Sequence, residues 1–149
     1  METGRHESQK YRLEKLKSAS DLEALIILYD EAVSRLNEAR QCFEEKNIKR
    51  MKEQIEMTKK IIRGLVGILD FQANREMAGN LYKIYEYILR RLGVAEVGIR
   101  QTPKILEEAG GHLSQLREAW IAVQEKGDVT EGFKVHLTSE DRNFLNIEI

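Results

Sequence analysis

Residues 20–46 read SDLEALIILYDEAVSRLNEARQCFEEK, and this stretch decides the fold. Its apolar side chains recur at alternating spacings of three and four positions, which places them along one face of a helix. Ser20 and Glu23 form a capping box, because the serine hydroxyl accepts from an early amide while the glutamate reaches back. The pattern predicts a helix over residues 21–46 that buries one stripe: Leu22, Leu25, Tyr29, Ala32, Leu36, Ala39 and Phe43.

The same spacing continues in the stretches that follow and predicts helices over residues 48–69, 74–92 and 102–127. In the last two of these helices the residues expected to face the core are Met77 or Ala78, Leu81, Tyr85, Ile88, Leu92, Leu106, Ala109, Leu113, Leu116, Trp120 and Val123. Gly93 is expected to end the third helix, and Thr102 followed by Pro103 to open the fourth. Short connections force successive helices to run antiparallel, and an apolar repeat of about seven residues on every helix favours shallow crossing angles between them. The sequence therefore predicts an all-α protein, an up-down-up-down four-helix bundle.

The ends of the chain differ from this pattern. We expect the bundle to occupy residues 21–126, with a separate segment at 1–20 and an appendage at 127–149. In the appendage Phe133, Val135 and Leu137 alternate like a short strand, but no partner strand occurs elsewhere. Its role stays open: it folds back on the bundle as a self-inhibitor, or it is a foreign addition.

The composition argues against nucleic acid binding, membrane insertion and secretion. Twenty-four Lys and Arg balance twenty-five Asp and Glu, so the net charge of −1 supplies no positive field for nucleic acid. No apolar stretch is long enough to cross a membrane, and the start METGRHESQK lacks the apolar run of a secretion signal. We expect a cytoplasmic protein with no nucleic acid partner and no membrane insertion.

The residues of common catalytic and metal sites are absent or scattered. None of the histidines follows a glutamate by three positions, as a carboxylate-bridged metal site in a bundle requires: His6, His112 and His136. The lone Cys42 has no local signature of a nucleophile and is expected to pack against the bundle. We predict no catalytic residue, no metal, no cofactor and no enzymatic activity.

Apolar residues beyond the needs of one core stripe are the informative feature. In the second helix Met57, Ile61 and Ile68, with Gly64, form a displaced second stripe, and in the first Ile27 and Leu28 lie off the main line. Further residues of this kind occur in the third and fourth helices: Tyr82, Ile84, Tyr87, Leu89, Ile105 and Ile121. Some are explained as half-buried core edges, and the rest would line grooves that accept a partner helix.

Three stretches then suggest a family. Residues 69–92, LDFQANREMAGNLYKIYEYILRRL, resemble the signature of the FliS family of flagellar export chaperones. Residues 25–33, LIILYDEAV, and residues 116–120, LREAW, are similar to that family at the corresponding places in the first and fourth helices.

The resemblance implies a bundle that binds the C-terminal segment of flagellin, prevents its premature polymerisation and presents it to a component of the flagellar export gate. It also implies that the segment before the first helix covers part of the client groove, here through Tyr11, Leu13 and Leu16. For this function we expect a monomer or weak dimer and the following client-binding residues: Met57, Ile61, Gly64, Ile68, Tyr82, Ile84, Tyr87, Leu89, Ile105 and Ile121. The alternative is a helical adaptor that binds an amphipathic helix of another protein.

Overall fold

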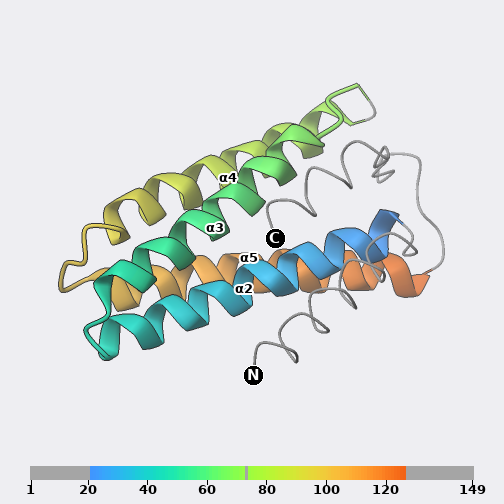
Figure 1. The fold of residues 1–149 in the computed structure, drawn as a ribbon. Coiled ribbons are helices and arrows are strands. Elements are labelled where there is room, and N and C mark those ends of the chain that lie inside the picture. The colour runs from blue at the N-terminus through green and yellow to red at the C-terminus, as the bar shows by residue number, and fades with distance from the viewer. Residues whose placement is uncertain (1–20, 73, 127–149) are drawn as a thin grey trace.

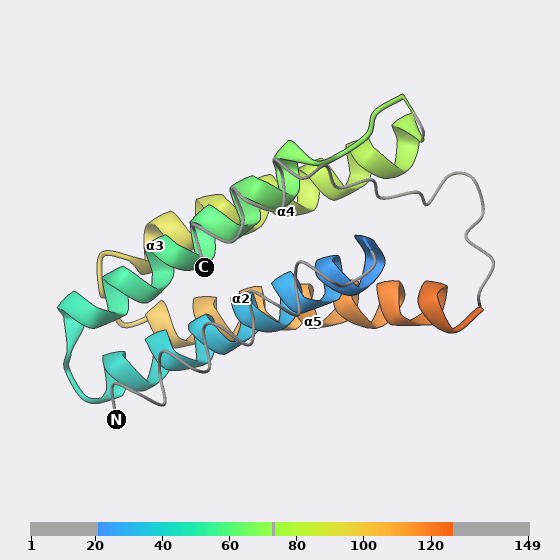
Figure 2. The same ribbon diagram turned by 45° about the vertical axis from the view of Figure 1, so that its right-hand side comes forward.

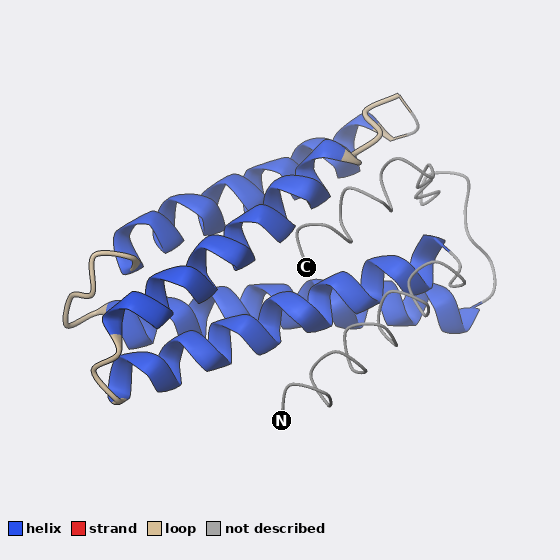
Figure 3. Ribbon diagram, viewed as in Figure 1, coloured by secondary structure: helices blue, strands red, loops and turns tan. Residues whose placement is uncertain are grey.

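The computed structural model describes residues 21–72 and 74–126, which form four helices. These are α2 (Asp21–Glu44), α3 (Ile48–Gly67), α4 (Arg75–Ala95) and α5 (Thr102–Lys126), and no strand occurs within the described ranges (Figure 3). The all-α prediction is therefore confirmed. The expected capping box at Ser20, the segment 1–20 and the appendage 127–149 lie outside the described residues.

Side-chain caps and left-handed residues set the helix ends. The Asn47 side chain accepts from Arg50 N at 3.2 Å, and the Asn74 side chain accepts from Met77 N at 3.0 Å, so each asparagine satisfies one free amide. Gly93 does not end α4, contrary to expectation, because the helix continues to Ala95. The residue with positive φ in this connection is Gly98, at 75°, where the chain turns toward α5.

The helices are arranged as a square in which each lies beside its neighbours in the chain. α2 packs closely against both α3 and α5, while α4 completes the square with looser contacts to α3 and α5. Figure 1 shows α3 and α4 as one layer above α2 and α5. In Figure 2 these layers diverge toward the end that holds the start of α4 and the end of α5. We call this the wide end of the bundle.

The core runs along the centre of the square and is broader than single stripes predict. Leu25, Tyr29 and Leu36 are buried as expected, but Leu28, expected off the main line, is fully buried as well. The reason is that α2 packs against two neighbours at once, so its buried face extends to both sides of the stripe. An ion pair between Asp30 and Arg117 joins α2 to α5 at the surface.

Candidate functional site

An apolar cleft lies between α4 and α5 in their halves nearest the wide end. Its volume is about 420 Å³. Residues from both helices line it: Met77, Leu81, Leu116, Ala119, Trp120, Ala122 and Val123. The lining has no charged side chain, and its volume falls within the roughly 300–1,000 Å³ of typical ligand pockets. The cleft can therefore accept a few apolar side chains of a partner, whose burial supplies the binding energy.

The divergence of the two layers and two small residues together leave this space empty. Elsewhere in the square, large side chains such as Leu36 and Ile88 belong to one core cluster and are almost completely buried. On α5, Ala119 and Ala122 also line the cleft, close to Trp120 in the sequence. A methyl side chain fills little of the space between α5 and α4. The cleft is thus an unfilled part of the same core, open at one side.

A buried polar cluster lies behind the cleft. The Trp120 indole N–H donates to the Tyr29 hydroxyl at 3.2 Å, and that hydroxyl is hydrogen-bonded to the hydroxyl of Tyr85. The three residues come from α5, α2 and α4, and each is at most 5% exposed. Burial raises the pKa of both tyrosines, since ionisation would place a charge in an apolar core. Both phenols therefore stay neutral at physiological pH and serve as hydrogen-bonding groups.

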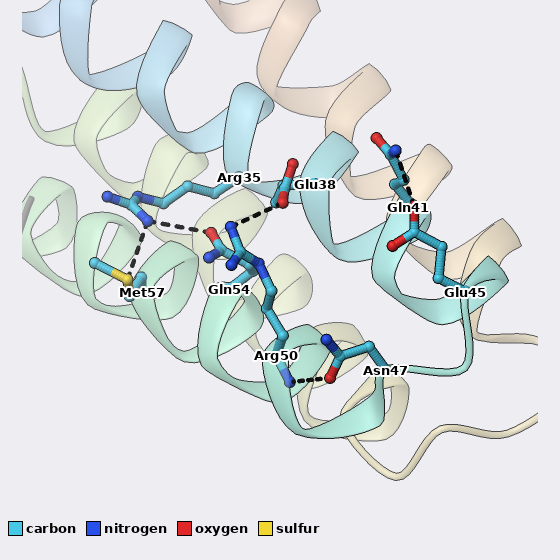
Figure 4. Close-up of polar contacts among 8 residues, drawn as sticks. All are labelled: Arg35, Glu38, Gln41, Glu45, Asn47, Arg50, Gln54 and Met57. Atoms are coloured by element: carbon cyan, nitrogen blue, oxygen red, sulfur yellow. Dashed lines mark hydrogen bonds and ion pairs between the residues drawn. The ribbon is translucent and has the colours of Figure 1, made fainter. Parts of the chain in front are cut away.

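The predicted client-binding residues of α3 do not share one exposed stripe. Ile61 and Gly64 are buried, so their assignment to an outer stripe is wrong: α3 packs against both α2 and α4, which covers this arc. Met57 is half-buried, and its sulfur accepts from Arg35 Nη1 at 3.0 Å on the side of α3 that faces α2 (Figure 4). Ile68 is half-buried against the core.

Polar contacts fill much of the α2–α3 face around Met57. Arg35 Nη1 also donates to Gln54 Oε1 at 3.1 Å, and Arg50 pairs with Glu38 at 3.1 Å. Figure 4 shows these side chains crossing between the two helices. Polar and charged groups thus surround Met57, where an apolar groove was expected, and the apolar cleft is instead between α4 and α5.

The predicted tyrosines of α4 are exposed, but they belong to different contacts. Tyr82 is 42% exposed and meets the ring of Phe71 edge to face, with centroids 6.4 Å apart. Tyr87 is 43% exposed and meets His112 of α5 edge to face at 5.9 Å. Ile84 and Leu89 are half-buried against the core. The rings therefore do not form one continuous aromatic face.

The remaining predicted site residues have mixed positions. Ile105 is 2% exposed, which corrects its assignment to an outer surface, because it packs into the core at the start of α5. Ile121 is half-buried near the end of the same helix. The predicted groove-capping residues Tyr11, Leu13 and Leu16 lie outside the described part of the chain.

Sequence reasoning assigned most cleft residues to the core stripe rather than to a site. Met77, Leu81, Leu116, Trp120 and Val123 do occupy stripe positions, and only the geometry reveals that they border an open cleft between α4 and α5. The available signal was the pair of alanines on either side of the single tryptophan. Small residues beside a large anchor leave room for another side chain.

Two negative findings apply to residues 21–72 and 74–126. No three His, Cys, Asp or Glu side chains come together there as ligands of a metal ion. Of the helices described, none combines the length and the apolar character needed to cross a bilayer.

The chain is similar to known flagellar proteins over most of its length. The family model described as "Flagellar protein FliS" matches residues 4–127. The flagellar secretion chaperone FliS of Salmonella typhimurium is 33% identical over 115 residues, which cover 76% of this chain and 84% of that protein. FliSB of Pseudomonas aeruginosa is 30% identical over 97 residues, covering 65% and 75%, and FliS of Bacillus subtilis is 26% identical over 112 residues, covering 74% and 80%.

These relatives are named as chaperones, which confirms the prediction that the chain is not an enzyme. The family match spans most of the sequence, and it includes all four helices of the described residues. The resemblance seen in residues 25–33, 69–92 and 116–120 is therefore confirmed as well. The chain belongs to the FliS family of flagellar proteins.

Proposed function

We propose that this chain is a cytoplasmic flagellar secretion chaperone. It binds the C-terminal segment of flagellin, prevents premature polymerisation and delivers the subunit to the export apparatus through a gate component. Membership of a family whose relatives carry the name flagellar secretion chaperone supports the general role. The cleft between α4 and α5 supports a protein client, because its lining is apolar and suits side chains rather than a charged small molecule.

The cleft is the single observation that carries the client-binding step. A disordered segment gains little affinity per unit of area because it must become ordered, so it needs a few deep apolar anchors. The cleft offers such an anchor site, with Trp120 in the wall formed by α5 and Met77 and Leu81 in the wall formed by α4. Exposed Phe71 and Tyr82, at the α3–α4 connection and the start of α4, extend the apolar surface at the same end of the bundle.

Calorimetry with the intact chain and a flagellin C-terminal peptide tests the proposal. We expect binding in the micromolar range or tighter, with a negative heat-capacity change from apolar burial. A peptide of the same composition in scrambled order is the control. Absence of binding at micromolar concentrations refutes the proposal.

The alternative of a general helical adaptor predicts a different pattern. An adaptor would bind an unrelated amphipathic helix as tightly as the flagellin peptide, since both would bury similar area. A preference of less than about ten-fold, or about 1.4 kcal/mol, for the flagellin peptide favours the adaptor.

A further inference from the structure

The hydrogen-bond cluster behind the cleft joins three helices through side-chain bonds, which apolar core packing alone does not require. Tyr29, Tyr85 and Trp120 come from three different helices, and Tyr29 and Tyr85 belong to opposite corners of the square. Tyr29 and Tyr85 do not line the cleft, whereas Trp120 does. A chain of polar contacts therefore runs from the centre of the bundle to the wall of the binding cleft.

We propose that Tyr29 and Tyr85 are positioning residues for client recognition: they fix the Trp120 indole as a wall of the cleft and thereby keep the cleft open. This inference rests on the proposed function of the cleft. It also assigns a physical role to tyrosines of LIILYDEAV and NLYKIYEY, the stretches that carry the family resemblance.

The chemistry of the indole explains why it needs this support. Its N–H is a donor without acceptor capacity, and a buried indole is normally hydrogen-bonded. Trp120 is 5% exposed, and its N–H donates to the Tyr29 hydroxyl at 3.2 Å. Tyr29 is itself fully buried and held by its bond to Tyr85, so the acceptor cannot turn away easily.

Loss of the acceptor has a definite structural consequence. Without the Tyr29 hydroxyl, the indole loses the hydrogen bond that holds its ring toward the centre of the bundle, so the ring is expected to shift toward open space. The adjacent free volume is the cleft of about 420 Å³, which opens beside the ring. The ring would then occupy the space that the client side chains need. Removing a hydroxyl at the centre of the bundle should therefore weaken client binding without a direct contact.

The test uses the full chain with Tyr29→Phe and, as a matched control, Thr58→Val. The Thr58 hydroxyl is fully buried and donates to Gln54 O at 2.9 Å in α3, so its removal also deletes one buried hydrogen bond. Thr58 does not line the cleft. Trp120 is the single tryptophan of the chain, so its fluorescence reports the indole without added labels.

We expect Tyr29→Phe to shift the tryptophan emission of the free protein to longer wavelength and to increase its quenching by acrylamide. We also expect the affinity for the flagellin peptide to fall by roughly five- to ten-fold. Thr58→Val should change neither readout. Tyr85→Phe leaves the indole its acceptor and should give a smaller change in the same direction, which keeps the test available if Tyr29→Phe folds poorly.

Two results would overturn the positioning role: unchanged emission in both tyrosine variants, or a shifted emission with unchanged peptide affinity. Failure of the unmodified chain to bind the peptide has a different meaning, because it refutes the proposed client rather than the support of the indole. The fluorescence of the free protein separates these cases, since it is measured without any client.

Discussion

Substituting a larger side chain into the cleft lining is a direct test of the role of the cleft in client binding. Ala122 lies in the cleft lining and is exposed, so Ala122→Phe adds a ring where the client is expected to insert a side chain. The substitution changes no charge and replaces one helix-compatible residue with another. We expect the variant to fold normally and to bind the flagellin C-terminal peptide more weakly than the unmodified chain.

The volume of the cleft sets the expected size of the effect. At about 420 Å³ the cleft accommodates the added ring without displacing Met77 or Leu81. Full burial of one large apolar side chain is worth about 1.5–3 kcal/mol, and the client loses this contribution when the position is taken. The dissociation constant should therefore rise by roughly ten- to one-hundred-fold. The same burial within the chain should hold the urea midpoint at or slightly above its original value.

Calorimetry and urea denaturation of the same preparations provide the two measurements. Gln124→Phe is the matched control, because Gln124 is an exposed, uncharged residue of α5 that does not line the cleft. The reasoning is refuted if Ala122→Phe binds the peptide with unchanged affinity while folded. It is also refuted if Gln124→Phe weakens binding to the same extent.

Further predictions concern stability. Leu36→Ala should lower the free energy of unfolding by about 2–5 kcal/mol in urea titrations, and Leu81→Ala by less, since Leu81 already borders the open cleft; equal losses would contradict this. Ile61→Asp should abolish the helical circular dichroism, because the charge would be buried at a position with no exposure, and a native spectrum would be the contrary result. Burial raises the pKa of Tyr29 and Tyr85, so above about pH 10 the unfolded chain releases protons that the folded chain retains. The contribution of these two tyrosines to stability is therefore complete below about pH 10 and declines as the pH rises above it, and the double Phe variant should show a shallower decline in urea titrations across this range.

Several features were predictable from sequence because they depend on local rules. The three-four spacing of Leu25, Tyr29 and Leu36 follows from helix geometry, and it correctly identified side chains of the buried face. Asn47 and Asn74 lie at helix starts because a short polar side chain can accept from a free amide. The family resemblance was equally visible, since it rests on motifs within single helices.

The apolar cleft between α4 and α5 was not predictable in the same way. Ile61 and Ile105 were expected outside the core because a single helix offers no means of knowing how many neighbours will cover it. Met77 and Leu116 were expected inside the core for the opposite reason. Each helix has the same kind of stripe, so spacing alone cannot distinguish a covered position from an uncovered one.

The sequence by itself determined that the chain forms amphipathic helices, where most of them begin and end, and which family it belongs to. The tertiary structure decided where the bundle is left open, namely between α4 and α5 at the wide end. It also decided that Trp120 lines this opening while its indole N–H donates to the buried hydroxyl of Tyr29. The physical reason is that helix periodicity acts over a few residues, whereas burial is fixed by the distances and angles between helices far apart in the chain.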